Sequence, residues 1–229
     1  MIRGWLVLAL GLCAASLGAF PLPPALEIGH LVGKGRPSGA PPIPVTDELY
    51  ALGWGPDGAF STLERRWAGG GQQVRLRVYD LVEDVVLWEK TWPDWKDDQD
   101  GWWAARGPEV DAVFARFKLE PVQFQLGVFP LIYDEDFYRL TLRLTRNSDD
   151  PTWIERLELS VVATGRGIKT VSDRGGLWRW ATLVGFVPSP YEGRVALVFL
   201  VQPAGWGGEN QPIRYLISGL SLKAGFAKP

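Results

Sequence analysis

Short stretches of alternating apolar and polar residues, separated by turns rich in glycine and proline, recur through the chain from residue 48 onward. In residues 73–79, for example, Val74, Leu76 and Val78 alternate with polar side chains. Because successive side chains of a β-strand point to opposite faces of a sheet, this pattern predicts half-buried strands. The sequence therefore predicts an all-β fold of antiparallel meanders, arranged as two packed sheets or as an open propeller-like array.

Ten strands follow from this pattern, and one short helix interrupts them. The helix is expected at residues 108–118, where Pro108 suits a first helical position and Val110, Val113 and Phe114 share one face. A glycine-rich link is expected at residues 165–176. The expected strands, which place residues 47–229 in one domain, are 49–54, 59–67, 73–79, 85–92, 122–133, 137–146, 153–162, 178–186, 194–202 and 213–222.

The first twenty residues have the layout of a secretory signal peptide. Arg3 precedes an apolar run at residues 5–12, which is too short to span a membrane, and small residues follow it. We expect cleavage after Gly18 or Ala19, so that residues 1–19 are lost and the protein is periplasmic or secreted.

Cys13 offers an alternative, because the sequence LGLC is similar to a lipoprotein signal. Lipidation of Cys13 would make the protein a lipid-anchored component of the cell envelope. Residues 20–46 contain many prolines and glycines, which predicts an extended leader. Its apolar residues, such as Leu26, are expected to dock on the folded domain.

The composition excludes several classes of function. The chain has one His and one Cys in 229 residues, which removes most metal sites and most nucleophile–base pairs. The one histidine, His30, lies in the leader, and no G-x-S-x-G motif is present. The formal net charge of −2 argues against a nucleic-acid partner. We therefore expect no catalytic residue, no metal site and no cofactor.

Tryptophan is unusually frequent, and five of the 12 tryptophans lie in residues 88–103. Exposed aromatic rings stack on sugars, so Trp95, Trp102 and Trp103 are candidate ligand-binding residues. The simpler interpretation is that these rings fill the core or cap a sheet edge. Both interpretations stay open at this point.

The same segment carries Asp97, Asp98 and Asp100, which we include among the candidate ligand-binding residues. Several carboxylates on one loop are typical of calcium sites. The EF-hand spacing fails, however, because Lys96 and Gly107 occupy positions that need acidic residues. A solvated acidic loop is the alternative.

Two other patterns carry charge. Arginines 75, 77, 139, 143 and 156 occupy predicted outward strand positions, where they would form a basic stripe for an anionic polymer or an acidic protein. A solvated face balanced by nearby glutamates is the alternative. The acidic turn at residues 134–136 supplies carboxylates of the type that glycosidases use in pairs.

Three stretches resemble a family of predicted secreted bacterial proteins of unknown function. They are LGWGPDG at residues 52–58, VPSPYEGRVA at residues 187–196 and LSLKAGF at residues 220–226, and the first two have a rhythm similar to propeller blades. These motifs are turns and core strands. The resemblance implies an exported β protein, and it assigns no catalytic residue.

Together these observations predict an exported, non-enzymatic binding or interaction protein of the cell envelope. A protein is favoured over a small molecule as its partner, and an envelope glycan stays open. The first alternative is a carbohydrate-binding module that uses the tryptophan-rich residues 88–103. The second alternative is a carboxylate-dependent glycosidase, which needs two acids facing each other across a cleft.

Overall fold

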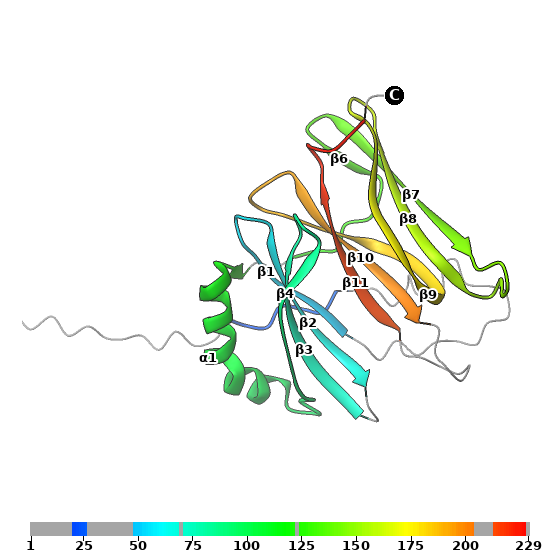
Figure 1. Cartoon of the computed structure of the whole chain (residues 1–229). Helices are drawn as coiled ribbons and strands as arrows, with labels where there is room; N and C mark the ends of the chain where they lie inside the picture. The colour runs from blue at the N-terminus through cyan, green and yellow to red at the C-terminus, as the bar shows by residue number, and fades with distance from the viewer. Residues whose placement is uncertain (1–19, 27–47, 69–70, 122–123, 204–212, 228–229) are drawn as a thin grey trace, which may run out of the picture.

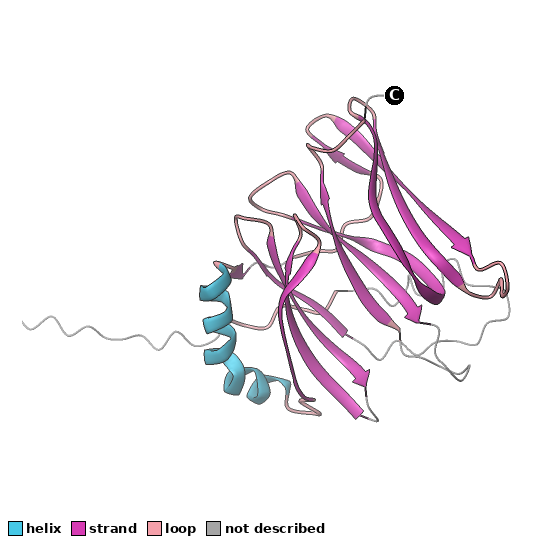
Figure 2. Cartoon of the chain, in the orientation of Figure 1, coloured by secondary structure: helices cyan, strands magenta, loops and turns pink. Residues whose placement is uncertain are grey.

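The structure, a computed structural model, describes residues 20–26, 48–68, 71–121, 124–203 and 213–227. Two antiparallel sheets and one helix make up this part of the chain (Figure 2), so the all-β prediction is confirmed. The predicted signal peptide, Cys13 and most of the leader lie outside the described residues. Within them, no helix is long and apolar enough to cross a membrane.

The first sheet has the strand order β4-β3-β2-β1-β5. The four-strand meander predicted from the alternating pattern is confirmed, and its tight turn between β1 and β2 places Gly58 at φ +82°, which glycine adopts without strain. The short strand β5 pairs with the end of β1. The strands are β1 (Glu48–Trp54), β2 (Ala59–Ala68), β3 (Gly71–Asp80), β4 (Val85–Pro93) and β5 (Glu120–Pro121).

The helix α1 (Gln99–Phe117) begins earlier than its sequence pattern indicates. Asp98 caps its N-terminus, where a side-chain oxygen accepts a hydrogen bond from the amide of Gly101 at 2.9 Å. Pro108 therefore lies inside the helix, and the expectation that it begins the helix is wrong. Interior proline removes one backbone hydrogen bond and crowds the preceding turn. The helix changes direction along its length (Figure 1).

The second sheet has the strand order β11-β10-β9-β8-β7-β6. Its β7, β8, β10 and β11 lie close to the expected positions, and β10 is paired on both sides. The strands are β6 (Leu131–Tyr133), β7 (Asp136–Arg146), β8 (Ile154–Ala163), β9 (Gly167–Pro188), β10 (Arg194–Pro203) and β11 (Arg214–Ser221).

Two expectations for this sheet are wrong. Of the long strand expected at residues 122–133, the described part, 124–133, contains β6 and an isolated bridge between Gly127 and Phe186. The glycine-rich link expected at residues 165–176 is instead a turn at residues 165–166 followed by the first half of β9. Pairing with β8 along this stretch supplies hydrogen bonds that outweigh the conformational cost of glycine in a strand.

The elements stack in layers, with α1 on one side of the first sheet and the second sheet on the other (Figure 1). One apolar cluster lies between α1 and the first sheet, and another lies between the two sheets. The first half of β9 pairs with β8 and its second half with β10, so the second sheet encloses a third cluster of its own. The result is packed sheets, the first of the two predicted arrangements.

The turn between β3 and β4 fastens the two sheets together. Asp84 accepts hydrogen bonds from the hydroxyl of Ser218 at 2.9 Å and from the amide of Gly219 at 3.0 Å. Arg194 donates to the carbonyl of Leu81 at 2.8 Å. A Cβ at Gly219 would lie 1.9 Å from that carbonyl oxygen, so only glycine allows this approach.

Candidate functional site

The tryptophan-rich segment packs inward. The side chains of Trp95 and Trp103 are 5% and 6% exposed, and both belong to the cluster under α1. Trp95 makes an edge contact with Tyr50 at 5.9 Å, and the Trp103 indole N–H donates to the carbonyl of Phe20 at 2.7 Å. Sugar stacking needs an exposed ring face, and these two rings do not offer one.

Trp102 and the three candidate aspartates lie at the start of α1. Trp102 is half-buried and donates from its indole to the carbonyl of Pro93 at 3.1 Å. Asp97, Asp98 and Asp100 are exposed, and Asp98 serves as the helix cap. Within the described residues no group of three acidic, His or Cys side chains is placed to hold a metal ion. The segment thus attaches α1 to the first sheet.

Asp94, in the same segment, forms an ion pair with Arg65. This pair was not predicted from the sequence. Asp94 accepts two hydrogen bonds from Arg65, at 2.8 and 3.1 Å, and the guanidinium carbon lies 5.3 Å from the Trp95 ring centroid. Burial by itself raises the pKa of Asp94, but hydrogen bonds from Arg65 and from the amide of Lys96 lower it below its ordinary value. This pair anchors the segment to β2.

The predicted basic stripe is split between two surfaces. Arg75 and Arg77 lie on β3 and point toward the second sheet, where Arg75 pairs with the buried Glu64 and Arg77 with Glu89 at 3.0 Å. Arg139 and Arg143 lie exposed on the outer face of β7. Alternation alone cannot show that both faces of the first sheet are covered.

The acidic turn closes the hairpin between β6 and β7. Asp134 and Glu135 have φ of 53° and 66°, the left-handed conformation of a two-residue hairpin turn. Arg166 pairs with Asp136 at 2.5 Å and with Asp134 at 3.1 Å. These two carboxylates therefore neutralise a guanidinium and hold two adjacent hairpins together.

The outer edge of the second sheet is one open strand edge of the described residues, and β4 at the edge of the first sheet is another. Strand β6 pairs with β7 only as far as Tyr138, whereas β8 pairs with β7 along its other side to Arg146. Among the described residues, none pairs with the free side of residues 140–146 of β7, which we call the β7 edge. Figure 1 shows β7 on the outside of the described part of the molecule.

The leucines of the β7 edge confirm that this side of the sheet is incompletely covered. Leu140, Leu142 and Leu144 point into the interior but are only half-buried. Their direct neighbours on β8, which occupy the same layer, are fully buried; these are Val161, Leu159 and Leu157. The interior of the second sheet is therefore accessible along β7.

Exposed apolar residues lie beside the β7 edge, on the outer face of β6 to β9. Ile132, Val162 and Ile168 are 71%, 42% and 50% exposed, and we call them the outer patch. Val162 is directly opposite both Arg139 and Ile168. The Arg139 guanidinium lies 5.2 Å from the ring centroid of Phe137, which is paired with Ile132. The patch therefore continues across four strands.

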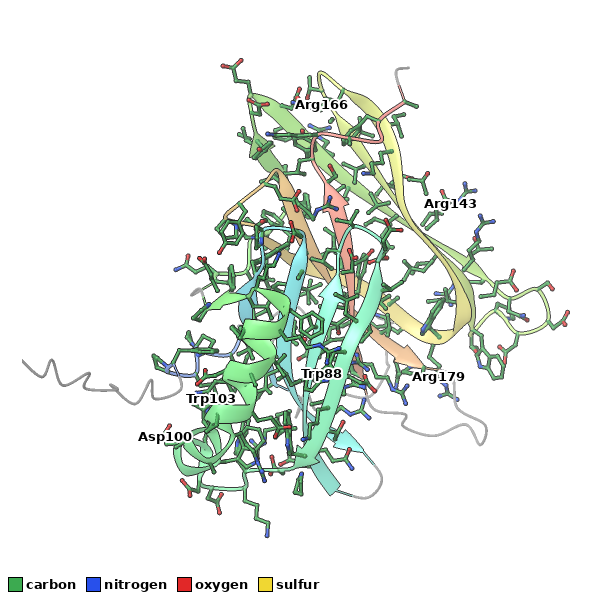
Figure 3. The ribbon with its side chains drawn as sticks, turned by 60° about the vertical axis from the view of Figure 1, so that its left-hand side comes forward. Trp88, Asp100, Trp103, Arg143, Arg166 and Arg179 are labelled. Carbon is green, nitrogen blue, oxygen red and sulfur yellow. The ribbon has the colours of Figure 1, made fainter. Side chains whose placement is uncertain are left out.

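Arginine gives this surface its charge. Arg139 and Arg143 alternate with Thr141 on the outer face, and Glu158 lies opposite Arg143 on β8. Figure 3 shows Arg143 on the side of the molecule opposite the helix that carries Asp100 and Trp103. The arrangement suits a protein-sized partner better than a small molecule, because it is a strand edge and a flat face.

The sequence predicted that these arginines point outward. It did not reveal the open edge, because the position of β7 in the sheet depends on contacts between distant strands. A local signal was Pro130, which directly precedes β6 and has no backbone N–H to continue the pairing. No protein-family model matches the chain, and neither a curated protein nor a solved structure is significantly similar to it.

Proposed function

We propose that the protein is an exported, non-enzymatic binding protein that acts at the cell envelope, and that its partner is a protein. The signal-peptide layout of residues 1–19 supports export. The partner is proposed to dock on the β7 edge and the outer patch.

The observation that carries this proposal is the outer patch next to a strand, β7, that has one open side. Single exposed apolar residues are common on protein surfaces, but a group of them marks interaction sites more often. Proteins usually shield long strand edges, since an exposed edge pairs readily with another chain. Ile132, Val162 and Ile168 therefore combine two features of binding surfaces in one place.

The two alternatives have less support. A carbohydrate-binding module would need Trp95 and Trp103 on the surface, and both are buried. A glycosidase would need free acids on opposite sides of a cleft, whereas Asp134 and Asp136 both pair with Arg166.

Chemical crosslinking in intact cells of the source organism, followed by mass spectrometry, tests the proposal. We expect one dominant envelope protein to be captured by the wild-type chain and to be lost from a variant with Ile132→Ser and Val162→Ser. The comparison variant carries Val85→Ser and Val86→Ser, exposed positions on β4, the open edge strand of the first sheet. Loss of capture in the comparison variant, with or without loss in the first variant, or loss in neither, would count against this surface.

A further inference from the structure

We infer, on the basis of the proposed function, that the β7 edge binds an extended segment in which acidic and apolar residues alternate. The segment would add a strand to the second sheet. This names the chemistry of the partner at the proposed site, and it follows from the backbone, the side chains and the charge of the β7 edge.

The backbone groups of alternate residues point to the open side. The carbonyl of Phe137 accepts a hydrogen bond from the amide of Thr164 at 3.2 Å, so Phe137 faces β8. Backbone groups alternate in direction along a strand, so Leu140, Leu142 and Leu144 direct their N–H and C=O groups away from β8. No described strand pairs with these donors and acceptors, so an incoming strand could bond to them.

The length of the β7 edge suits a short peptide segment. Residues 140–146 span roughly 23 Å at about 3.3 Å per residue. A partner segment of about seven residues would therefore pair along the whole edge. Main-chain hydrogen bonds would supply the affinity, and alternate side chains would supply the specificity.

The two faces of β7 favour different side chains on the incoming segment. On the outer face Arg139 and Arg143 stand on either side of Thr141, which favours acidic residues on an adjacent strand. On the inner face the half-buried leucines would be covered by apolar residues of the same strand. Because side chains alternate along a strand, the partner must alternate acidic and apolar residues.

A second copy of this chain is a poorer occupant. Pairing two β7 edges would place Arg139 and Arg143 of both copies on neighbouring strands of one face, and β7 carries no acidic residue among its outward positions 139–145. Like charges on neighbouring strands destabilise a sheet, and charged edge residues discourage self-pairing. Charge complementarity therefore favours an acidic segment.

The test titrates the purified full-length protein with a fluorescent peptide of seven alternating Glu and Val residues, its ends blocked, and follows anisotropy. Two further peptides serve as probes: one has Lys in place of Glu, and one is N-methylated at alternate amides. We expect the acidic peptide to bind at least about tenfold more tightly than either probe. In a variant with Arg139→Glu and Arg143→Glu, we expect the preference to reverse toward the Lys peptide.

Arg116→Glu is the matched control, because Arg116 is an exposed arginine on α1, and we expect it to leave the acidic peptide's affinity unchanged. Thermal unfolding of each variant shows whether it is folded. Equal binding of the N-methylated and unmodified acidic peptides would overturn strand pairing. A concentration-dependent dimer in sedimentation that the acidic peptide does not dissociate would overturn the choice of occupant.

The outcome is distinguishable from failure of the proposed function. If the acidic peptide fails to bind while cellular crosslinks still map to Ile132 and Val162, the partner uses the outer patch without adding a strand, and only this inference fails. If the acidic peptide fails to bind and the cellular crosslinks map to a different surface, the proposed binding surface itself is wrong.

Discussion

The buried ion pair between the sheets allows a quantitative prediction. Glu64 and Arg75 lie directly opposite each other on β2 and β3, and they are 3% and 7% exposed. Arg75 donates from Nε and Nη2 to the same carboxylate oxygen, Oε2, and the other oxygen, Oε1, is buried without a partner. Arg66 is close by, and burial together with the charge of Arg75 lowers the pKa of Arg66.

Substitution Glu64→Leu should therefore be costly. It would leave Arg75 buried without a counter-charge and next to a second guanidinium, that of Arg66. Breaking one side of a buried pair typically costs about 3–5 kcal/mol, and we expect a loss of unfolding free energy in that range. The unpartnered oxygen of Glu64 already costs about 1–3 kcal/mol, so the intact pair contributes little net stability.

The double variant with Glu64→Leu and Arg75→Met should then recover most of the loss, and lie within about 1 kcal/mol of the wild type. Urea unfolding followed by tryptophan fluorescence measures all four proteins of the cycle. Because either single substitution breaks the pair at a cost of about 3–5 kcal/mol, the coupling between the two sites should reach about 5 kcal/mol. If the double variant lost as much as the two single variants added together, this account of the buried pair would be refuted.

Three further predictions concern packing. Asp94→Asn should lower the unfolding free energy by about 1–2 kcal/mol at neutral pH. Because the folded pKa of Asp94 lies below its unfolded value, the stabilisation from its pair with Arg65 should be lost as pH falls below about 4. The unfolding free energies of wild type and variant, measured against pH, should therefore converge in acid. Gly219→Ala should cost about 2 kcal/mol or more, since its Cβ would overlap the Leu81 carbonyl, and a matched change at the open Gly71 should not lower the melting temperature comparably. Trp103→Phe removes the indole N–H that bonds the leader and also part of a buried ring, so we expect about 1–3 kcal/mol of lost stability and faster proteolysis near residue 20.

Local patterns predicted much of the fold. The alternation of Val74, Leu76 and Val78 identified β3. These three side chains all point toward α1, and the residues between them point toward the second sheet, so the side chains alternate as expected for a strand. The helix start was misplaced because Pro108 is a start signal by type, and the hydrogen bond of Asp98 that really begins α1 is visible only in the structure.

The candidate site was harder to predict than the fold. The position of Trp95 and Trp103 depends on where α1 lies over the first sheet, so a cluster in the sequence did not distinguish core from surface. The β7 edge depends on strand order in the second sheet, which joins residues far apart in the chain. Sequence could indicate that Arg139 and Arg143 face outward, but not that their strand has an open side.

Site-specific photocrosslinking in intact cells tests the central claim most directly. A photoreactive residue would replace Thr141, which is exposed near the start of the β7 edge, or Ala112, which is exposed on α1. The account predicts that Thr141 captures one envelope protein through an acidic, extended segment, and that Ala112 captures nothing comparable. Capture of the same protein from Ala112 but not from Thr141 would place the binding surface on the helix and contradict the account.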